Sequence, residues 1–405
     1  MFVKFNLFTK ILMCCLLISS FTARATELDI ESESKALLNS GVSGFSIAIL
    51  DHNGLILSKG YGYADVKNKI AMTDKTIQNI GSISKTITGA AAMQLVEQGK
   101  LDLDENINTY LPFSVLHPDF PNTPITARQL LTHTSAIVDR SAIYDGDLSY
   151  HYGGDNPIPL GDFLKDYFTP KEAIYSVDNF ATYAPGTERK YSNIAYGLVA
   201  LVVESISDMP FNDFTKKHIF TPLGMTSTGW MLSDIKQSDH AQLYKFEDEE
   251  LKKIEWYGLV TWPDGGLRTS VTDLSKFIVT MINEGRHNEI HILEPKTVQS
   301  IFRPQFSQGS VLSKVKEIDS YKQAITWNVI KRKSGDTIIG HNGGDPGIRT
   351  YTYFDPQTSK GMVLFLNTAS RDEVINKAVS TYIQSLLSIM NQKHISKLPI
   401  AKPLG

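Results

Sequence analysis

Residues 81–98, GSISKTITGAAAMQLVEQ, constrain the fold and chemistry of this 405-residue chain more than any other stretch. Small and apolar residues recur there at helical spacing, which predicts a buried helix. These positions are Ile87, Ala90, Ala91 and Leu95. Ser82 and Lys85 stand three residues apart at the front of this helix. That spacing places both side chains on one helical face, one turn apart.

A serine and a lysine in this arrangement meet the requirements of an activated nucleophile. The serine lies where free backbone N–H groups and the positive end of the helix dipole are found. The lysine amine can accept or share the hydroxyl proton if burial and neighbours lower its pKa. The S-x-x-K pattern alone is weak, because it also occurs at Ser32–Lys35, Ser233–Lys236 and Ser313–Lys316. Of the four, only Ser82 is followed by a sustained apolar helix.

The first 25 residues have the features of a signal peptide. Lys4 and Lys10 form a positive n-region, and Ile11–Phe21 is an apolar core that is too short to span a bilayer as a mature helix. Ala23-Arg24-Ala25 fits the A-x-A cleavage rule. We therefore predict removal of residues 1–25 and export of the protein to the periplasm or the medium.

Cleavage after Ala25 would leave 380 of the 405 residues and remove three positive charges with no acid, so the formal charge would change from −3 to −6. A mildly acidic chain is a poor candidate for binding nucleic acid. Both cysteines, Cys14 and Cys15, lie in the predicted signal peptide, so we expect no disulfide and no cysteine chemistry. No later apolar run is long enough to predict a membrane span.

Periodicity predicts strands near both ends of the chain and helices between them. Gly44–Leu50 and Gly54–Tyr61 flank an Asn53-Gly54 turn, which indicates a β-hairpin. The other predicted strands are Thr337–His341, Ile348–Phe354 and Gly361–Asn367. The other predicted helices are Thr126–His133, Pro157–Phe168, Ile194–Ile206, Phe211–Phe220, Thr272–Asn283, Pro295–Phe302 and Glu373–Leu387. Long ordered loops are expected across Tyr144–Ala184.

This order predicts an α+β fold in which both ends of the chain form one antiparallel sheet and a mostly helical subdomain is inserted between them. The expected hydrolase domain spans residues 26–390. Its sheet subdomain covers residues 30–80 and 260–390, and its helical subdomain covers residues 85–255. Residues 391–405 are expected to form a C-terminal tail.

Three motifs follow one another along the chain: Ser82-Ile83-Ser84-Lys85, Tyr191-Ser192-Asn193 and His341-Asn342-Gly343. Together they resemble the serine β-lactamase and penicillin-binding-protein superfamily, in its class C-like branch. Supporting stretches are Leu130–Ser135, Pro185-Gly186, Pro222–Met225 and Gly265–Leu267. Each motif is weak alone, but their shared order and spacing make the resemblance strong over nearly the whole predicted mature chain.

The resemblance implies a β-lactamase/transpeptidase-like fold and hydrolysis through an acyl-enzyme. Ser82 would be the nucleophile, and Lys85 with Tyr191 would carry protons. Asn193 would orient Lys85 and the substrate carbonyl, and the backbone N–H groups of Ser82 and Gly344 would form the oxyanion hole. No metal or organic cofactor is implied.

The third motif departs from class C β-lactamases. His341-Asn342 stands where those enzymes have Lys-Thr, whereas H-x-G is found in DD-carboxypeptidases, D-amino-acid peptidases and esterases of this branch. Together with Gly343 and Gly344, these residues would bind the substrate. An imidazole with an ordinary pKa near 6.5 would bind a substrate carboxylate best when charged. Arg349 is the rival carboxylate anchor.

The leading interpretation is a DD-carboxypeptidase-like serine hydrolase that acts on D-Ala-type peptides or small amides. The alternatives are an esterase or class C-like β-lactamase, and an inactive peptidoglycan-binding or penicillin-sensing protein. Expected ligands are D-Ala peptides, β-lactams or esters, with no nucleic acid and no membrane span after signal cleavage. His133 is predicted to pack or hydrogen-bond at a helix end, and the second H-N-G copy, His52–Gly54, to form a turn.

Overall fold

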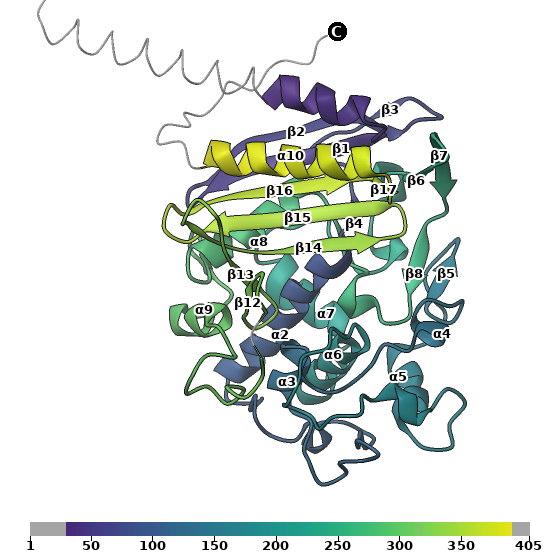
Figure 1. Cartoon of the computed structure of the whole chain (residues 1–405), viewed down its shortest axis with the longest axis vertical. Coiled ribbons are helices and arrows are strands. Elements are labelled where there is room, and N and C mark those ends of the chain that lie inside the picture. Colours follow the sequence, from purple (N-terminus) through teal and green to yellow (C-terminus); the bar gives the residue numbers. More distant parts are fainter. Residues whose placement is uncertain (1–29, 317, 391–405) are drawn as a thin grey trace, which may run out of the picture.

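The computed structural model describes residues 30–316 and 318–390. The predicted signal peptide and C-terminal tail lie outside the described residues. An eight-stranded, wholly antiparallel sheet crosses the molecule in the order β12-β13-β14-β15-β16-β1-β2-β3 (Figure 1). Its strands are Lys322–Gln323 (β12), Asn328–Lys331 (β13), Thr337–Asp345 (β14), Ile348–Asp355 (β15), Lys360–Leu366 (β16), Gly44–Asp51 (β1), Gly54–Asp65 (β2) and Ile70–Ala71 (β3).

The two ends of the chain meet at the centre of this sheet, where β1 pairs with β16. Successive residues of β1 alternate between two buried faces, as the pleat of a strand requires. Phe45 and Ile47 pack with α10 (Glu373–Met390) and the helix of residues 30–39 on one face. Ala48 and Leu50 pack toward the helical part of the molecule on the other face. Because both faces are covered, β1 and β16 are apolar at most positions.

The helical part lies on the face of the sheet opposite α10 (Figure 1). Its α-helices are Ser84–Glu97 (α2), Ala127–Leu131 (α3), Ser141–Tyr144 (α4), Leu160–Phe168 (α5), Ile194–Ser207 (α6), Phe211–Thr215 (α7), Val271–Ile282 (α8) and Pro295–Phe302 (α9). Helix α2 is buried from Ser84 to Leu95, so it is a central core helix rather than an amphipathic surface helix. Thr126 caps α3 through a reciprocal capping box with Gln129.

Several short elements connect these layers. The 3₁₀ turns are Gly81–Ile83 (η1), Ile107–Thr109 (η2), Val177–Asn179 (η3), Leu232–Asp234 (η5), Gln237–Asp239 (η6) and Trp262–Asp264 (η7), and Lys216–Phe220 (η4) is a π-helix. Small sheets pair Gln78–Asn79 (β4) with Arg268–Thr269 (β9), Tyr150–Tyr152 (β5) with Tyr257–Leu259 (β8), Arg286–His287 (β10) with Ile290–His291 (β11), and Leu243–Glu247 (β6) with Glu250–Ile254 (β7) and Thr368–Ser370 (β17).

The predicted α+β architecture is confirmed, with local differences. The loops expected across Tyr144–Ala184 contain strand β5, and the strands β6 to β8 were not predicted. Strand β14 extends to Asp345, four residues beyond the predicted end, so the His341-Asn342-Gly343 motif lies inside a strand. Neither Asn342 nor the two glycines have high strand propensity, so the pairing of β14 with β15 overrides the local sequence signal.

Within residues 30–316 and 318–390, no single helix is long and apolar enough to cross a membrane. One pair of consecutive helices, Ile194–Ser207 and Phe211–Phe220, has the required length and composition when taken together, but the two are bent by 78° relative to each other.

Two adjacent glycines of β14 face opposite environments. A Cβ on Gly343 would lie 2.1 Å from the carbonyl oxygen of Ile80, whereas a Cβ on Gly344 would have no heavy atom within 4 Å. Thr350 reinforces this close approach, because its hydroxyl donates a 2.7 Å hydrogen bond to the same Ile80 oxygen. Gly343 therefore allows β14 to lie directly against the segment that carries Ser82.

This difference predicts unequal effects of the same substitution at neighbouring positions. Gly343→Ala should lower the free energy of unfolding by about 1–3 kcal/mol, because it overpacks a backbone contact. Gly344→Ala should change it by less than about 0.5 kcal/mol, because its site is open. Urea unfolding of the two variants tests this. Equal losses of stability would contradict the proposed contact between β14 and the Ile80 segment.

Candidate active site

Ser82 lies on the 3₁₀ turn η1, two residues before α2 begins. We predicted it within the front of the helix, and the structure places it on the turn that leads into it. Gly81 adopts a left-handed conformation with φ of 54°, which favours glycine. A Cβ on Gly81 would lie 3.0 Å from the backbone nitrogen of Gly344. The turn therefore holds the backbone around Ser82 beside Gly344, as the predicted oxyanion hole requires.

Lys85 lies one turn below Ser82 and is fully buried. Its ammonium donates hydrogen bonds to Ser82 Oγ at 3.1 Å, Asn193 Oδ1 at 2.7 Å and the Asp264 carbonyl oxygen at 2.8 Å. The rings of Tyr191 and Tyr196 lie 5.1 and 5.4 Å from the same nitrogen. Three oxygens thus satisfy the three N–H donors of a buried ammonium, as its burial demands.

Tyr191 and Asn193 reach Ser82 and Lys85 from the segment just before α6. The Tyr191 hydroxyl donates a 2.9 Å hydrogen bond to Ser82 Oγ. Ser82 therefore contacts both groups that were predicted to carry its proton. Tyr191 also stacks on His133, with ring centroids 4.1 Å apart. His133 accepts a hydrogen bond on Nδ1 from the Ser192 N–H, so it packs and hydrogen-bonds beside the end of α3, as predicted, and it also orients the tyrosine.

Asp139 fixes the orientation of Asn193. Its carboxylate accepts hydrogen bonds from the Asn193 backbone N–H and from Asn193 Nδ2, at 2.7 and 2.8 Å. The Ser192 hydroxyl and the Ile194 N–H also donate to it. Because the amide nitrogen of Asn193 is held by Asp139, its oxygen faces Lys85. Asp139 therefore has two roles: it accepts hydrogen bonds from backbone N–H groups at the start of α6, and it orients Asn193 so that Oδ1 accepts a hydrogen bond from Lys85.

Asp264 adds a second buried ionisable group beside Lys85. Its Oδ1 lies 3.7 Å from the lysine nitrogen and accepts a 3.1 Å hydrogen bond from the Tyr144 hydroxyl. Its Oδ2 is buried and has no hydrogen-bond partner among the described residues. Burial raises the pKa of Asp264, while the Lys85 charge opposes that shift. Asp264 is therefore a buried carboxyl group within ion-pair distance of the Lys85 ammonium.

A cavity of about 280 Å³ opens above Ser82. Its wall brings together residues from five separate parts of the chain. They are Ser82, His133, Arg189, Tyr191, Tyr321, Asn328, His341, Asn342 and Gly344. The predicted residues Ser82, Tyr191, His341, Asn342 and Gly344 thus share one cavity, and Lys85 and Asn193 lie beneath it in contact with Ser82 or with each other. Gly343 faces Ile80 instead of the cavity.

His341 lines this cavity, but it is not the titrating cation that the sequence suggested. Burial, assisted by the positive charge of Lys85, lowers the pKa of His341 to about 4. Its Nδ1 lies 2.7 Å from the Asn342 carbonyl oxygen, which can only accept, so the neutral ring donates from Nδ1. Its other nitrogen, Nε2, is then an acceptor. The predicted binding of a carboxylate by a charged His341 is therefore wrong at neutral pH.

Arg349 is also excluded as the carboxylate anchor. Its guanidinium hydrogen-bonds to the side chain of Asn376 in α10 and to the Ser370 carbonyl oxygen in β17. It does not line the cavity that contains Ser82. The alternation of side chains along β15 explains this, because Arg349 lies on the α10 side of the sheet while Thr350 points to Ile80.

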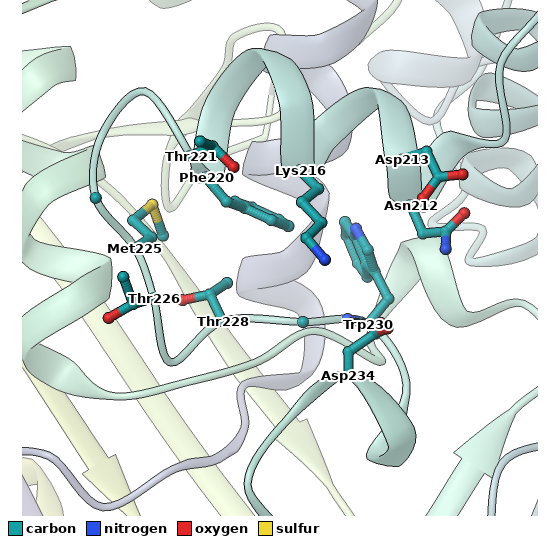
Figure 2. Close-up of a pocket in the computed structure, with 12 residues that line it drawn as sticks. Asn212, Asp213, Lys216, Phe220, Thr221, Met225, Thr226, Thr228, Trp230 and Asp234 are labelled. Carbon is teal, nitrogen blue, oxygen red and sulfur yellow. Dashed lines mark hydrogen bonds between the residues drawn. The ribbon is translucent and has the colours of Figure 1, made fainter.

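A second cavity, of about 290 Å³, lies between α7, η4 and the loop that leads to Trp230 (Figure 2). Lys216 projects into it above Trp230, and Asp213 and Asp234 lie at its edge. None of the predicted site residues line it. In the described part of the chain, no group of three or more His, Cys, Asp or Glu side chains is placed to hold a metal ion.

Three residues of the site were missed by sequence reasoning: Asp139, Asp264 and Arg189. Asp264 directly precedes the supporting stretch Gly265–Leu267, but its carboxyl group was not predicted to act. Asp139 and Arg189 belong to no motif in the sequence. Arg189 is two residues before Tyr191, and that proximity was the one available signal.

Comparison with known proteins places the chain in a family. The model of the Beta-lactamase family matches residues 28–380. The chain belongs to the Beta-lactamase family. The predicted membership of the superfamily that contains the β-lactamases and penicillin-binding proteins is thereby confirmed. A curated relative is protein flp of Staphylococcus aureus (strain NCTC 8325 / PS 47), 25% identical over 331 residues, which cover 81% of this chain. The chain spans about 60% of the length of that relative.

Solved structures share the fold. An octameric penicillin-binding protein homologue from Pyrococcus abyssi is 25% identical with a TM-score of 0.72, over 90% of this chain and 78% of that one. A D-amino acid amidase from Ochrobactrum anthropi SV3, solved with L-phenylalanine amide, is 21% identical with a TM-score of 0.68, over 89% and 99%. The similarity to the amidase supports the fold alone.

The joint contact of Ser82 with Lys85 and Tyr191 predicts a non-additive pair of substitutions. Lys85→Met and Tyr191→Phe should each slow acylation by about 10²–10⁴-fold, the usual contribution of a general acid or base. Because both act on the same proton, the double variant should be little slower than the worse single variant. Single-turnover kinetics with a chromogenic ester measures this. Multiplicative losses would show that the two residues act independently.

The lowered pKa of His341 predicts that this ring does not titrate in the working range. Between about pH 5.5 and 8.5, wild type and His341→Asn should show the same pH dependence of KM for a carboxylate-bearing peptide, whatever their absolute values. An imidazole with an ordinary pKa would instead raise KM in the wild type alone as pH rises through about 6.5. Such a wild-type-specific rise would contradict the neutral assignment.

Proposed function

We propose that this protein is an exported serine hydrolase that forms an acyl-enzyme on Ser82 and cleaves D-Ala-type peptides or related small amides. The observation that carries the proposal is the position of Ser82 Oγ, 3.1 Å from Lys85 Nζ and 2.9 Å from the Tyr191 hydroxyl. Export rests on the signal-peptide pattern of residues 1–25.

In the proposed reaction, Ser82 Oγ attacks the substrate carbonyl carbon as its proton passes to the Lys85–Tyr191 pair. The resulting oxyanion is bound by the backbone N–H groups of Ser82 and Gly344, which lie on adjoining segments. The C–N bond then breaks, and the Tyr191 hydroxyl delivers a proton to the leaving amine. Water attacks the acyl-enzyme, gives its proton to the same pair, and releases the carboxylic acid and free Ser82.

The neutral His341 side chain on β14 favours hydrolysis of peptides or amides over hydrolysis of β-lactams as the main activity. Class C-like enzymes that act on lactams carry a lysine where this chain has His341. Here Nε2 of the neutral ring is an acceptor, suited to an N–H group of a substrate rather than to a carboxylate. An inactive binding role is disfavoured, because a binding module does not need Ser82, Lys85 and Tyr191 in mutual contact.

Intact-mass spectrometry tests the acyl-enzyme directly. Incubation with a penicillin, a D-Ala-D-Ala peptide and a p-nitrophenyl ester should each add one acyl group, with the shortest-lived adduct for the best substrate. Ser82→Ala should abolish the adduct and all labelling by a fluorescent penicillin or fluorophosphonate.

Ser233→Ala is the matched control, because Ser233 also begins an S-x-x-K pattern. There the serine hydroxyl donates to Asp155 and Lys236 pairs with Asp239, so the two residues do not contact each other. Labelling of Ser233→Ala should equal that of wild type. Labelling that survives Ser82→Ala would overturn the assignment of the nucleophile.

A further inference from the structure

The wall of the active-site cavity holds one side chain that is positively charged at neutral pH, namely Arg189. Both histidines of the wall are uncharged at that pH. Burial lowers the pKa of His341 to about 4 and that of His133 well below its usual range. The charge of Arg189 contributes to both shifts, so the guanidinium acts on this cavity electrostatically. Lys85 lies beneath the wall with its three donors already used.

Arg189 is held in place by contacts that leave most of its donors free. Its guanidinium carbon lies 6.0 Å from the ring centre of Tyr191 and 5.6 Å from that of Tyr321. Its Nε donates a 3.0 Å hydrogen bond to Gln323 Oε1. Gln323 is itself fixed, because it is buried and donates to the Ala324 carbonyl oxygen.

Among residues 30–316 and 318–390, neither Nη1 nor Nη2 of Arg189 has a hydrogen-bond acceptor, and no carboxylate forms an ion pair with this residue. A half-buried guanidinium oriented by two rings and a fixed amide, yet without a counter-ion, has its planar N–H donors available to a ligand. That geometry matches a carboxylate, which a guanidinium binds through two parallel hydrogen bonds.

We propose that Arg189 binds the terminal carboxylate of the substrate. The inference rests on the proposed function and narrows it: the preferred substrates would be peptides with a free C-terminal carboxylate, and the corresponding amides and neutral esters would be poorer ligands. Arg189 would determine specificity without taking part in the proton transfers at Ser82.

Three substrates and three variants test this role. The substrates are N-acetyl-L-Lys-D-Ala-D-Ala, the same peptide with a C-terminal carboxamide, and a neutral p-nitrophenyl ester. The variants are Arg189→Gln, which removes the charge, Arg189→Lys, which keeps the charge without the planar fork, and Lys190→Gln. Lys190 is the matched control, an exposed neighbouring cation that does not line the cavity.

Arg189→Gln should raise KM for the carboxylate peptide by about 10- to 100-fold, the range expected for losing hydrogen bonds to a charged group. It should leave kcat for that peptide, and KM for the carboxamide and the ester, within about twofold of wild type. For Arg189→Lys, KM for the carboxylate peptide should lie between the values of wild type and Arg189→Gln. For Lys190→Gln, KM should equal that of wild type. Equal losses on all three substrates would overturn the proposal and show that Arg189 acts through the position of Tyr191. Unchanged KM for the carboxylate peptide would overturn it as well.

A second measurement separates this inference from the proposed peptidase function. N-acetyl-D-alanine and its carboxamide are tested as competitive inhibitors of ester hydrolysis, which requires no peptide turnover. Stronger inhibition by the carboxylate, lost in Arg189→Gln, supports the anchor even if wild type cleaves neither peptide and the proposed function fails. Equal inhibition by the two compounds, or inhibition unchanged by Arg189→Gln, overturns the anchor even if both peptides are cleaved.

Discussion

The ammonium of Lys85 is the interaction on which the rest of the site depends. A fully buried cation carries a desolvation penalty of several kcal/mol unless every donor is paired. This one is paired by oxygens of Ser82 on η1, Asn193 at the start of α6 and Asp264 on η7. Asn193 and Asp264 are 108 and 179 residues away from Lys85 in the sequence. The same three contacts bring those segments together. The lysine therefore organises the polar centre of the fold as well as the nucleophile.

The neighbouring carboxyl group of Asp264 adds a condition to this arrangement. Its Oδ1 lies 3.7 Å from Lys85 Nζ, so an ionised Asp264 would form an ion pair with the ammonium, whereas a protonated Asp264 would not. Burial raises the pKa of Asp264, and its unpaired Oδ2 does nothing to stabilise the anion. The electrostatic environment of Lys85 thus depends on whether Asp264 holds a proton, and Tyr144 takes part by donating to Oδ1.

The sequence predicted those features that local pattern controls. The Asn53-Gly54 hairpin, the buried α2 helix and the capped α3 helix each follow from spacing or turn chemistry within a few residues. Ser82, Lys85 and Tyr191 were recognisable because their motifs occur in a fixed order. Asp139 and Asp264 were not, because each acts through contacts with residues far away in sequence. The charge state of His341 depends on burial and on Lys85, and neither is visible from its neighbours in the chain.

These electrostatic facts divide the cavity into two parts with separate tasks. A lysine on β14 would place a second permanent cation close to Lys85, and like charges in a buried site oppose each other. With His341 neutral, the strand presents an acceptor to the substrate instead. The free cation lies on the segment before Tyr191, at Arg189, where two aromatic rings and Gln323 hold it. Proton transfer is thereby assigned to Ser82, Lys85 and Tyr191, and recognition of charge to Arg189 in the wall of the cavity.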